Sequence, residues 1–213
     1  MLENLDVKLL NLDHRTDRLE AFKQECDKSK IISKYQRVSA TNGKLLDHKT
    51  IKQYTTIAGY EDILNNQKTN GLRLSYGGIG VALSYKKILS DCKNNTLILE
   101  DDILINENFD TIFTNTFYSL PSDWDILYLG WYNSKNLKTI QINQHVNRLS
   151  GQINGLQAWM INPESAKKIC SIFPIRYQID TEIYLQTKLN KYSTPCKIVT
   201  RSKHSWSSDI QIC

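Results

Sequence analysis

Features that mark fibrous, disordered or membrane-spanning chains are scarce or absent in this 213-residue sequence. Glycine contributes nine residues and proline four, so long flexible linkers are not expected. No apolar run approaches the roughly 18 residues that a membrane span needs. The first residues lack a basic segment followed by an apolar stretch, so we expect no signal peptide. With 40% apolar and 23% charged residues, the composition predicts a single globular domain over residues 1–213.

Cysteine is sparse and scattered, which argues against a disulfide framework or a common zinc motif. There is no C-x-x-C motif and no Cys/His pair at a zinc spacing. The five cysteines are Cys26, Cys92, Cys170, Cys196 and Cys213. An odd, dispersed set fits reduced thiols, and we therefore expect a cytoplasmic location. Cys26 and Cys92 fall on apolar faces of expected helices, where cysteine packs as a small apolar side chain.

Positive charge is unevenly distributed along the chain. The 27 Lys and Arg against 22 Asp and Glu give a net charge of +5. Residues 132–208 hold eleven basic and three acidic residues, which is +8 and leaves −3 for the remainder. A basic half facing a more acidic half favours an anionic ligand between them, although a solvated surface gives the same pattern. Since the basic residues form no dense run or nucleic-acid-reading motif, we expect no nucleic-acid partner.

Apolar runs and helical periodicities alternate along the chain. Strands are predicted at residues 7–12, 35–39, 96–99, 124–130, 155–161 and 196–200. Helices are predicted near residues 19–26, 79–92, 109–120, from 163 onward and at 180–189. Residues 44–74 are polar and weakly patterned, and residues 131–153 are expected to be loop with short strands. This alternation indicates an α/β fold, in which helices flank a mainly parallel sheet.

Three acids, Glu100, Asp101 and Asp102, directly follow the expected buried strand that ends at Leu99. In open α/β sheets, ligands bind just beyond the carboxyl ends of strands. Adjacent carboxylates repel one another and raise one another's pKa, and a divalent cation removes that repulsion. Oxygen ligands suit Mg²⁺ or Mn²⁺, which commonly bring a substrate diphosphate. The alternative is a solvated strand end whose acids cap the next turn.

A glycine-rich segment, Gly77-Gly78-Ile79-Gly80, runs directly into the helix that continues to Ser84 and beyond. Glycines there allow close backbone approach and offer free N–H groups to an anion. The pattern is not G-x-G-x-x-G and follows no clear strand. Tight packing of the helix explains the glycines equally simply.

Two arginines, Arg15 and Arg18, lie just after the first expected strand, on the ligand side of the sheet. Guanidinium groups at that position can clamp a phosphate bidentately. The alternative for Arg18 is an exposed helix residue paired with acids.

Two acids near the end of the chain, Asp180 and Glu182, are candidates for a general base, with His204 downstream. Asp180 is also well placed to cap a helix N-terminus. His204 is a candidate metal ligand or phosphate donor, although most histidines are neither.

Six segments occur in an order that is specific as a set: LLNLDHRTDRLEAF, RVSATNG, GGIGVALSYKKIL, LILEDDI, DWDILYLG and GLQAWMINPESAKKI. Together they resemble glycosyltransferase family 25, which includes bacterial lipopolysaccharide glycosyltransferases and procollagen galactosyltransferases. The resemblance covers about residues 7–180, with a tail, SSDIQ, at residues 207–211. One departure is visible, because the third segment usually contains Ser-His and here has Ser84-Tyr85.

The resemblance implies a GT-A-like fold, a UDP-sugar donor and Mn²⁺ or Mg²⁺ as cofactor. The family's version of the DxD metal motif falls on the three acids, so we predict a metal site of Asp102, Glu100 and His204. The residues predicted to bind the donor are Asn11, Leu12, Arg15, Ala40, Asn42, Gly43, Gly80, Ser84, Glu100 and Asp101.

The reaction that the resemblance implies is transfer of a hexose, galactose or glucose, with inversion. The acceptor is a hydroxyl of a glycan or protein, such as lipopolysaccharide or a collagen-like chain. We predict Asp180 as the general base and Glu182 as the second choice. The same acids also fit two other classes of protein, which remain open. These are a metal-dependent nuclease or phosphotransferase, and a non-catalytic nucleotide-sugar-binding module.

Overall fold

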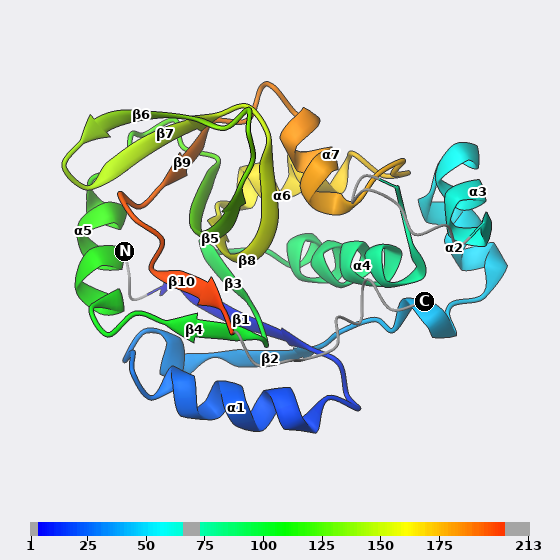
Figure 1. Ribbon diagram of the computed structural model, residues 1–213, viewed down its shortest axis with the longest axis horizontal. Coiled ribbons are helices and arrows are strands. Elements are labelled where there is room, and N and C mark those ends of the chain that lie inside the picture. The colour runs from blue at the N-terminus through cyan, green and yellow to red at the C-terminus, as the bar shows by residue number, and fades with distance from the viewer. Residues whose placement is uncertain (1–3, 66–72, 203–213) are drawn as a thin grey trace.

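The computed structural model describes residues 4–65 and 73–202 and contains an eight-stranded sheet with helices on both faces (Figure 1). The strand order is β2-β1-β3-β8-β5-β9-β7-β6. The strands are β1 (Asp6–Asn11), β2 (Gln36–Ser39), β3 (Thr96–Glu100), β5 (Ile126–Asn133), β6 (Lys138–Asn143), β7 (Val146–Ser150), β8 (Ile153–Ile161) and β9 (Lys191–Ser193). A separate two-stranded sheet pairs β4 (Ile103–Ile105) with β10 (Val199–Arg201).

The helices lie between and after the strands. They are α1 (Thr16–Cys26), α2 (His48–Tyr54), α3 (Ile57–Asn65), α4 (Tyr76–Ser90), α5 (Phe109–Tyr118), α6 (Pro163–Cys170) and α7 (Ile179–Leu185), with 3-10 turns η2 (Ile32–Lys34) and η3 (Gly43–Leu45). None of these described helices is both long and apolar enough to cross a membrane.

Strand direction confirms the predicted α/β class and mixed sheet. β1 runs parallel to β2 and β3, and β5 runs parallel to β9. β8 is antiparallel to β3 and β5, and β7 is antiparallel to β6 and β9. Six of the eight strands therefore point the same way, but the sheet is mixed rather than mainly parallel in its pairings. Four of the seven pairings are nevertheless antiparallel, because each reversed strand lies between two forward strands.

Two apolar layers sandwich the sheet, and alternation along β3 shows how they are divided. Leu97 and Leu99 pack on one face with Phe22 of α1. Ile98 packs on the other face with Tyr85 of α4. Because successive side chains of a strand point to opposite faces, Glu100 shares the side of Ile98 and faces α4. This alternation separates the environment of Glu100, the last residue of β3, from that of the acid that follows it.

Residues 44–65, which have a weak sequence pattern, fold into η3, α2 and α3. Asp47 caps α2, since its Oδ1 accepts a hydrogen bond of 2.6 Å from the Thr50 N–H. Helices of seven and nine residues with few buried positions are too short to show a long periodicity.

The start of α4 also differs from the prediction. The helix begins at Tyr76 rather than Ile79, and the Ser75 hydroxyl accepts a hydrogen bond of 3.0 Å from the Gly78 N–H. Glycine has a low helix propensity, so the first turn of α4 has the sequence of a loop. An N-cap serine offsets this by satisfying a backbone donor.

The end of the chain holds two further differences. β9 has only three residues and was not predicted, and the last described strand, β10, begins at Val199 rather than Cys196. The four described cysteines are free thiols, of which Cys26 is buried as predicted and Cys92 is only half-buried.

Candidate active site

The carboxyl ends of three parallel strands, β2, β1 and β3, meet at one edge of the sheet. Asn11 pairs with Ser39, and Leu10 pairs with Glu100. The segments that follow these strands therefore lie side by side. They contain most of the residues that the sequence predicts as ligand-binding.

Asp101 is held by two buried side chains. Asn11 Nδ2 donates to Asp101 Oδ2 at 2.7 Å, and Arg18 Nη1 donates to Asp101 Oδ1 at 3.1 Å. Burial raises the pKa of Asp101, although Asn11 and the Arg18 charge act in the opposite direction. Of the two interpretations of Arg18, pairing with acids is confirmed, but the side chain is buried rather than exposed.

Asp102 is contacted by a second arginine, which comes from the end of β10. Arg201 Nε donates to Asp102 Oδ2 at 2.8 Å, and Arg18 Nη1 lies 3.8 Å from the same oxygen. The Ser202 N–H donates to the Asp102 carbonyl at 2.8 Å, next to the pairing of Arg201 with Ile103. Arg18 and Arg201 therefore already neutralise negative charge on these carboxylates, a task that the sequence analysis gave to a divalent cation.

Glu100 points to the other side of the sheet, toward α4. The Tyr85 hydroxyl lies 2.9 Å from Glu100 Oε1 and 3.1 Å from the Leu156 carbonyl oxygen. Burial and the negative charge of Asp102 raise the pKa of Glu100 to about 7. Tyr85 stands where the resembling family usually has histidine, and here its hydroxyl contacts the first acid of the cluster.

Asn11 connects the ends of the three strands. Besides Asp101, its Nδ2 contacts the Arg15 carbonyl at 3.1 Å, and its Oδ1 accepts from Arg37 Nε at 2.8 Å. Arg37 also donates to Asp13. Sequence reasoning missed Arg37, because an arginine at the exposed start of a short strand resembles an ordinary surface residue. The Arg15 guanidinium pairs with Asp17, at 2.9 and 3.0 Å.

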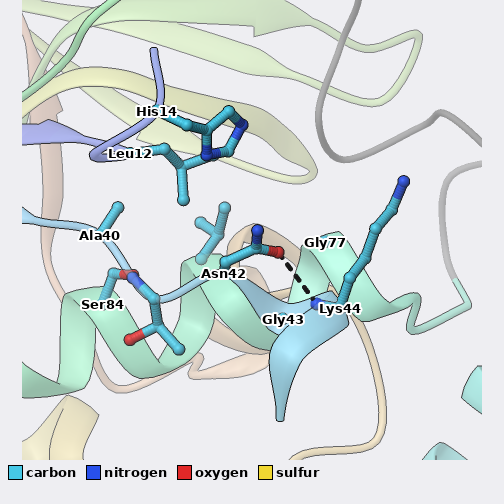
Figure 2. Close-up of a pocket in the computed structure, with 10 residues that line it drawn as sticks. Leu12, His14, Ala40, Asn42, Gly43, Lys44, Gly77 and Ser84 are labelled. Carbon is cyan, nitrogen blue, oxygen red and sulfur yellow. Dashed lines mark hydrogen bonds between the residues drawn. The ribbon is translucent and has the colours of Figure 1, made fainter. Parts of the chain in front are cut away.

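A pocket of about 130 Å³ opens beside these strand ends (Figure 2). Its lining residues are Leu12, His14, Ala40, Thr41, Asn42, Gly43, Lys44, Gly77, Val81 and Ser84. Five of the ten predicted donor-binding residues are among them: Leu12, Ala40, Asn42, Gly43 and Ser84. The other five, namely Asn11, Arg15, Gly80, Glu100 and Asp101, are not part of the lining. The pocket therefore lies between the turn at residues 40–43 and α4, beside the acid cluster.

Close backbone contact shapes the wall of this pocket. A Cβ on Gly80 would lie 2.6 Å from both the Gly43 nitrogen and the Thr41 oxygen, and one on Gly43 would overlap the Tyr76 carbonyl. Ser84 Oγ accepts from the Thr41 N–H at 2.8 Å and lies 2.7 Å from the Gly80 carbonyl oxygen. Tight packing thus explains Gly80, with the turn at residues 40–43 as the packing partner.

Asp180 lies in the first turn of α7, which packs on β8, the strand next to β3. Its Oδ2 accepts from the Gly155 N–H at 2.8 Å, and its Oδ1 accepts from the Thr181 N–H at 2.7 Å. Ile179 and Ile183 of α7 pack in the same apolar layer as Tyr85, so Asp180 lies on the α4 side of the sheet. Gly155 has φ +77°, which L-residues rarely adopt.

Glu182 has a different environment in the same helix. Its Oε1 accepts hydrogen bonds from the backbone N–H groups of Arg176 and Tyr177, at 2.6 and 2.8 Å. Glu182 therefore fixes the loop that enters α7. His204, the third member of the predicted metal site, lies outside the described residues, as does the segment 207–211.

Carboxylates of the cluster do not form a closed metal site by themselves. Within residues 4–65 and 73–202, no three His, Cys, Asp or Glu side chains are grouped so that they could hold a metal ion. Glu100 and Asp102 offer hard oxygen atoms, whereas both Asp101 oxygens are engaged by Asn11 and Arg18. Any cation here would need further ligands from a substrate, water or the remaining residues.

Comparison with known protein families identifies a family to which the chain is similar. The model of the family described as glycosyltransferase family 25 (LPS biosynthesis protein) matches residues 5–183. The matched region contains the acid cluster, the pocket, Asp180 and Glu182, and it ends before β9 and β10. No curated protein matches the sequence.

Proposed function

Because the chain belongs to glycosyltransferase family 25 and is an enzyme of sugar transfer, we propose that it moves a hexose from a UDP-sugar to an acceptor hydroxyl. The proposed sugar is galactose or glucose, and the transfer proceeds with inversion. The family description favours a lipopolysaccharide glycan over a protein as the acceptor. The observation that carries the proposal is the pocket beside the strand ends, with buried acids next to it.

The pocket is the proposed site of the nucleoside. Five predicted donor-binding residues line it, and the backbone of residues 40–43 forms one wall. His14 and Lys44, which are exposed, add polar groups at the same pocket (Figure 2). The Asn11 side chain links the end of β1 to Asp101 of the acid cluster through a hydrogen bond. The next residue, Leu12, lines the pocket. A donor bound here has its diphosphate directed toward Glu100 and Asp102.

Mn²⁺ or Mg²⁺ is the proposed cofactor, with Glu100 and Asp102 as protein ligands and His204 as a further one. Ions of this kind are commonly held by one or two carboxylates together with substrate phosphates. Repulsion between Asp102 and Glu100, which raises the pKa of Glu100, supports the proposal of a cation at these two carboxylates. When bound, the ion would stabilise negative charge on the departing diphosphate.

Asp180 is the proposed general base. Inverting transfer requires a carboxylate that accepts the proton of the acceptor hydroxyl as the new glycosidic bond forms. The Gly155 N–H holds the Asp180 carboxylate in place at 2.8 Å. Both acids accept two backbone hydrogen bonds, but those of Glu182 come from Arg176 and Tyr177 in the loop that enters α7, whereas Asp180 is bonded to Gly155 of β8, the strand next to β3. The contacts therefore favour Asp180 over Glu182.

Release of UDP from nucleotide-sugars tests the proposal without an acceptor. The chain is incubated with UDP-galactose, UDP-glucose and the corresponding GDP-sugars, with Mn²⁺ or with EDTA. We expect slow UDP release from one UDP-hexose, which EDTA abolishes. Cleavage of nucleic acid without UDP release would instead support the nuclease alternative. Binding of UDP without turnover, even with glycan acceptors, would support the non-catalytic alternative.

A further inference from the structure

Arg201 is a charged residue at the acid cluster for which the proposed reaction has no role. Its Nε donates to Asp102 Oδ2 at 2.8 Å. The Arg201 side chain is 38% exposed, whereas the Asp102 side chain is 6% exposed. The guanidinium therefore lies between a nearly buried carboxylate and the solvent.

The two arginines of the cluster differ in how firmly they are held. Arg18 belongs to α1, its side chain is 9% exposed, and it contacts Asp101 at 3.1 Å and Asp102 at 3.8 Å. Arg201 is the last residue of β10, a three-residue strand whose sheet partner is β4. A more exposed side chain at a strand end can move with less loss of packing than a buried side chain on a helix. Arg201 is thus the arginine that can leave the cluster.

A second cation at Asp102 would lie close to the Arg201 guanidinium. Asp102 also acts electrostatically on Glu100, so these two acids and Arg201 form one charge cluster. Like charges a few ångströms apart in a poorly solvated site repel strongly. Arg201 and a divalent ion therefore cannot both contact Asp102 at full strength.

We propose that Arg201 is a resident counter-cation of Asp102, which holds this carboxylate in the metal-free protein and which a divalent ion displaces. This inference rests on the proposed function, because it takes Asp102 as a metal ligand. Arg201 then lowers the affinity for the metal. It also couples metal occupancy to the end of β10, because Arg201 and Ser202 both contact Asp102.

Mn²⁺ binding without nucleotide, measured by titration calorimetry on the full chain, tests this role. Arg201→Met keeps much of the apolar stem and removes the charge. We expect the Kd for Mn²⁺ to fall by about tenfold in Arg201→Met, because a charge-assisted bond no longer competes. In EDTA the same variant should melt a few degrees lower, and Arg201→Lys should bind Mn²⁺ nearly as the unaltered chain does.

Arg148→Met is the matched control, because Arg148 is an exposed arginine of β7 that donates to Asn190 Oδ1 at 2.8 Å. It should leave the Kd for Mn²⁺ unchanged. Equal or weaker Mn²⁺ binding in Arg201→Met would overturn the inference and leave the proposed function standing. If Arg148→Met also bound Mn²⁺ more tightly, the change would be an effect of net charge, and the inference would be overturned. No Mn²⁺ binding in either Arg201→Met or the unaltered chain would overturn both the inference and the proposed cofactor.

Discussion

Individual residues of the acid cluster have separate environments although they are consecutive in sequence. Glu100 faces α4 and meets Tyr85, while Asp101 meets Asn11 and Arg18. This separation follows from the alternation of side chains along a strand. Each acid therefore depends on different partners, and substitutions at these partners should have different effects.

Asp180→Asn should lower the turnover of sugar transfer by about 10²–10⁴-fold, because an amide cannot accept the proton of the acceptor hydroxyl. UDP binding, measured by calorimetry, should change little, since Asp180 does not line the pocket. Glu182→Gln serves as the comparison and should mainly lower the melting temperature, because Glu182 binds two backbone N–H groups. Turnover of Asp180→Asn equal to that of the unaltered chain would reject Asp180 as the base.

Tyr85→Phe should destabilise the fold by about 1–3 kcal/mol, because the Glu100 carboxylate and the Leu156 carbonyl lose their hydroxyl partner in a buried site. The measurement is the free energy of unfolding in urea. Tyr118→Phe, at a tyrosine that is 57% exposed, should have a much smaller effect. Equal effects of the two substitutions would contradict this account.

Elements of secondary structure position the pocket through backbone contact rather than through long side chains. The first turns of α4 lie against the turn at residues 40–43, with Gly80 and Gly43 at the point of contact. The helix and the turn are therefore fixed relative to each other only while these positions stay small.

Gly80→Ala should destabilise the protein by about 1–3 kcal/mol, because its Cβ meets backbone atoms that cannot rotate away. Those atoms belong to Gly43 and Thr41, both at 2.6 Å. UDP binding should weaken as well, since both residues line the pocket.

Gly78→Ala is the matched control in the same helix, because its Cβ meets the Gln178 side chain, which can shift. Urea unfolding and UDP calorimetry measure the two effects. A pocket that binds UDP equally well in Gly80→Ala and Gly78→Ala would argue against this explanation of the wall.

At the scale of the whole molecule, much of the fold follows from sequence periodicity, whereas the partners of the site residues do not. Long apolar runs such as residues 96–99 predict buried strands. The polar residues that follow these runs predict the edge of the sheet at which a ligand binds. The contact between Arg201 and Asp102 spans 99 residues, and no local pattern reports such a pairing. Likewise, the roles of Tyr85 and Arg37 depend on which strands are neighbours, which sequence spacing alone does not determine.

Lys191 makes the stability of the whole molecule depend on pH. It is 6% exposed, and its Nζ donates to the Gln186 carbonyl at 2.7 Å. Burial lowers the pKa of Lys191 from 10.5 to about 8, although the Asp125 charge acts in the opposite direction. Between these values the unfolded chain holds a proton that the folded chain has released. The free energy of unfolding therefore gains a contribution that rises with pH, by at most about 1.4 kcal/mol per pH unit.

Lys191→Met should remove this contribution. Relative to the unaltered chain, the variant should be most stable at roughly pH 7.5, and its advantage should shrink as the pH rises to roughly 10. Urea unfolding at several pH values measures the difference. A difference that stays constant over this range would show that Lys191 has an ordinary pKa in the folded protein.

The position of β9 has a consequence for the order in which the protein can assemble on the ribosome. Residues 191–193 lie between β5 and β7, and β9 is the strand through which the β6–β7 hairpin joins the rest of the sheet. A nascent chain that has emerged only as far as α7 can pair β1, β3, β5 and β8, but that hairpin then has no strand partner in the sheet. Completion of the sheet therefore waits for a late segment that lies beyond the region matched by the family model.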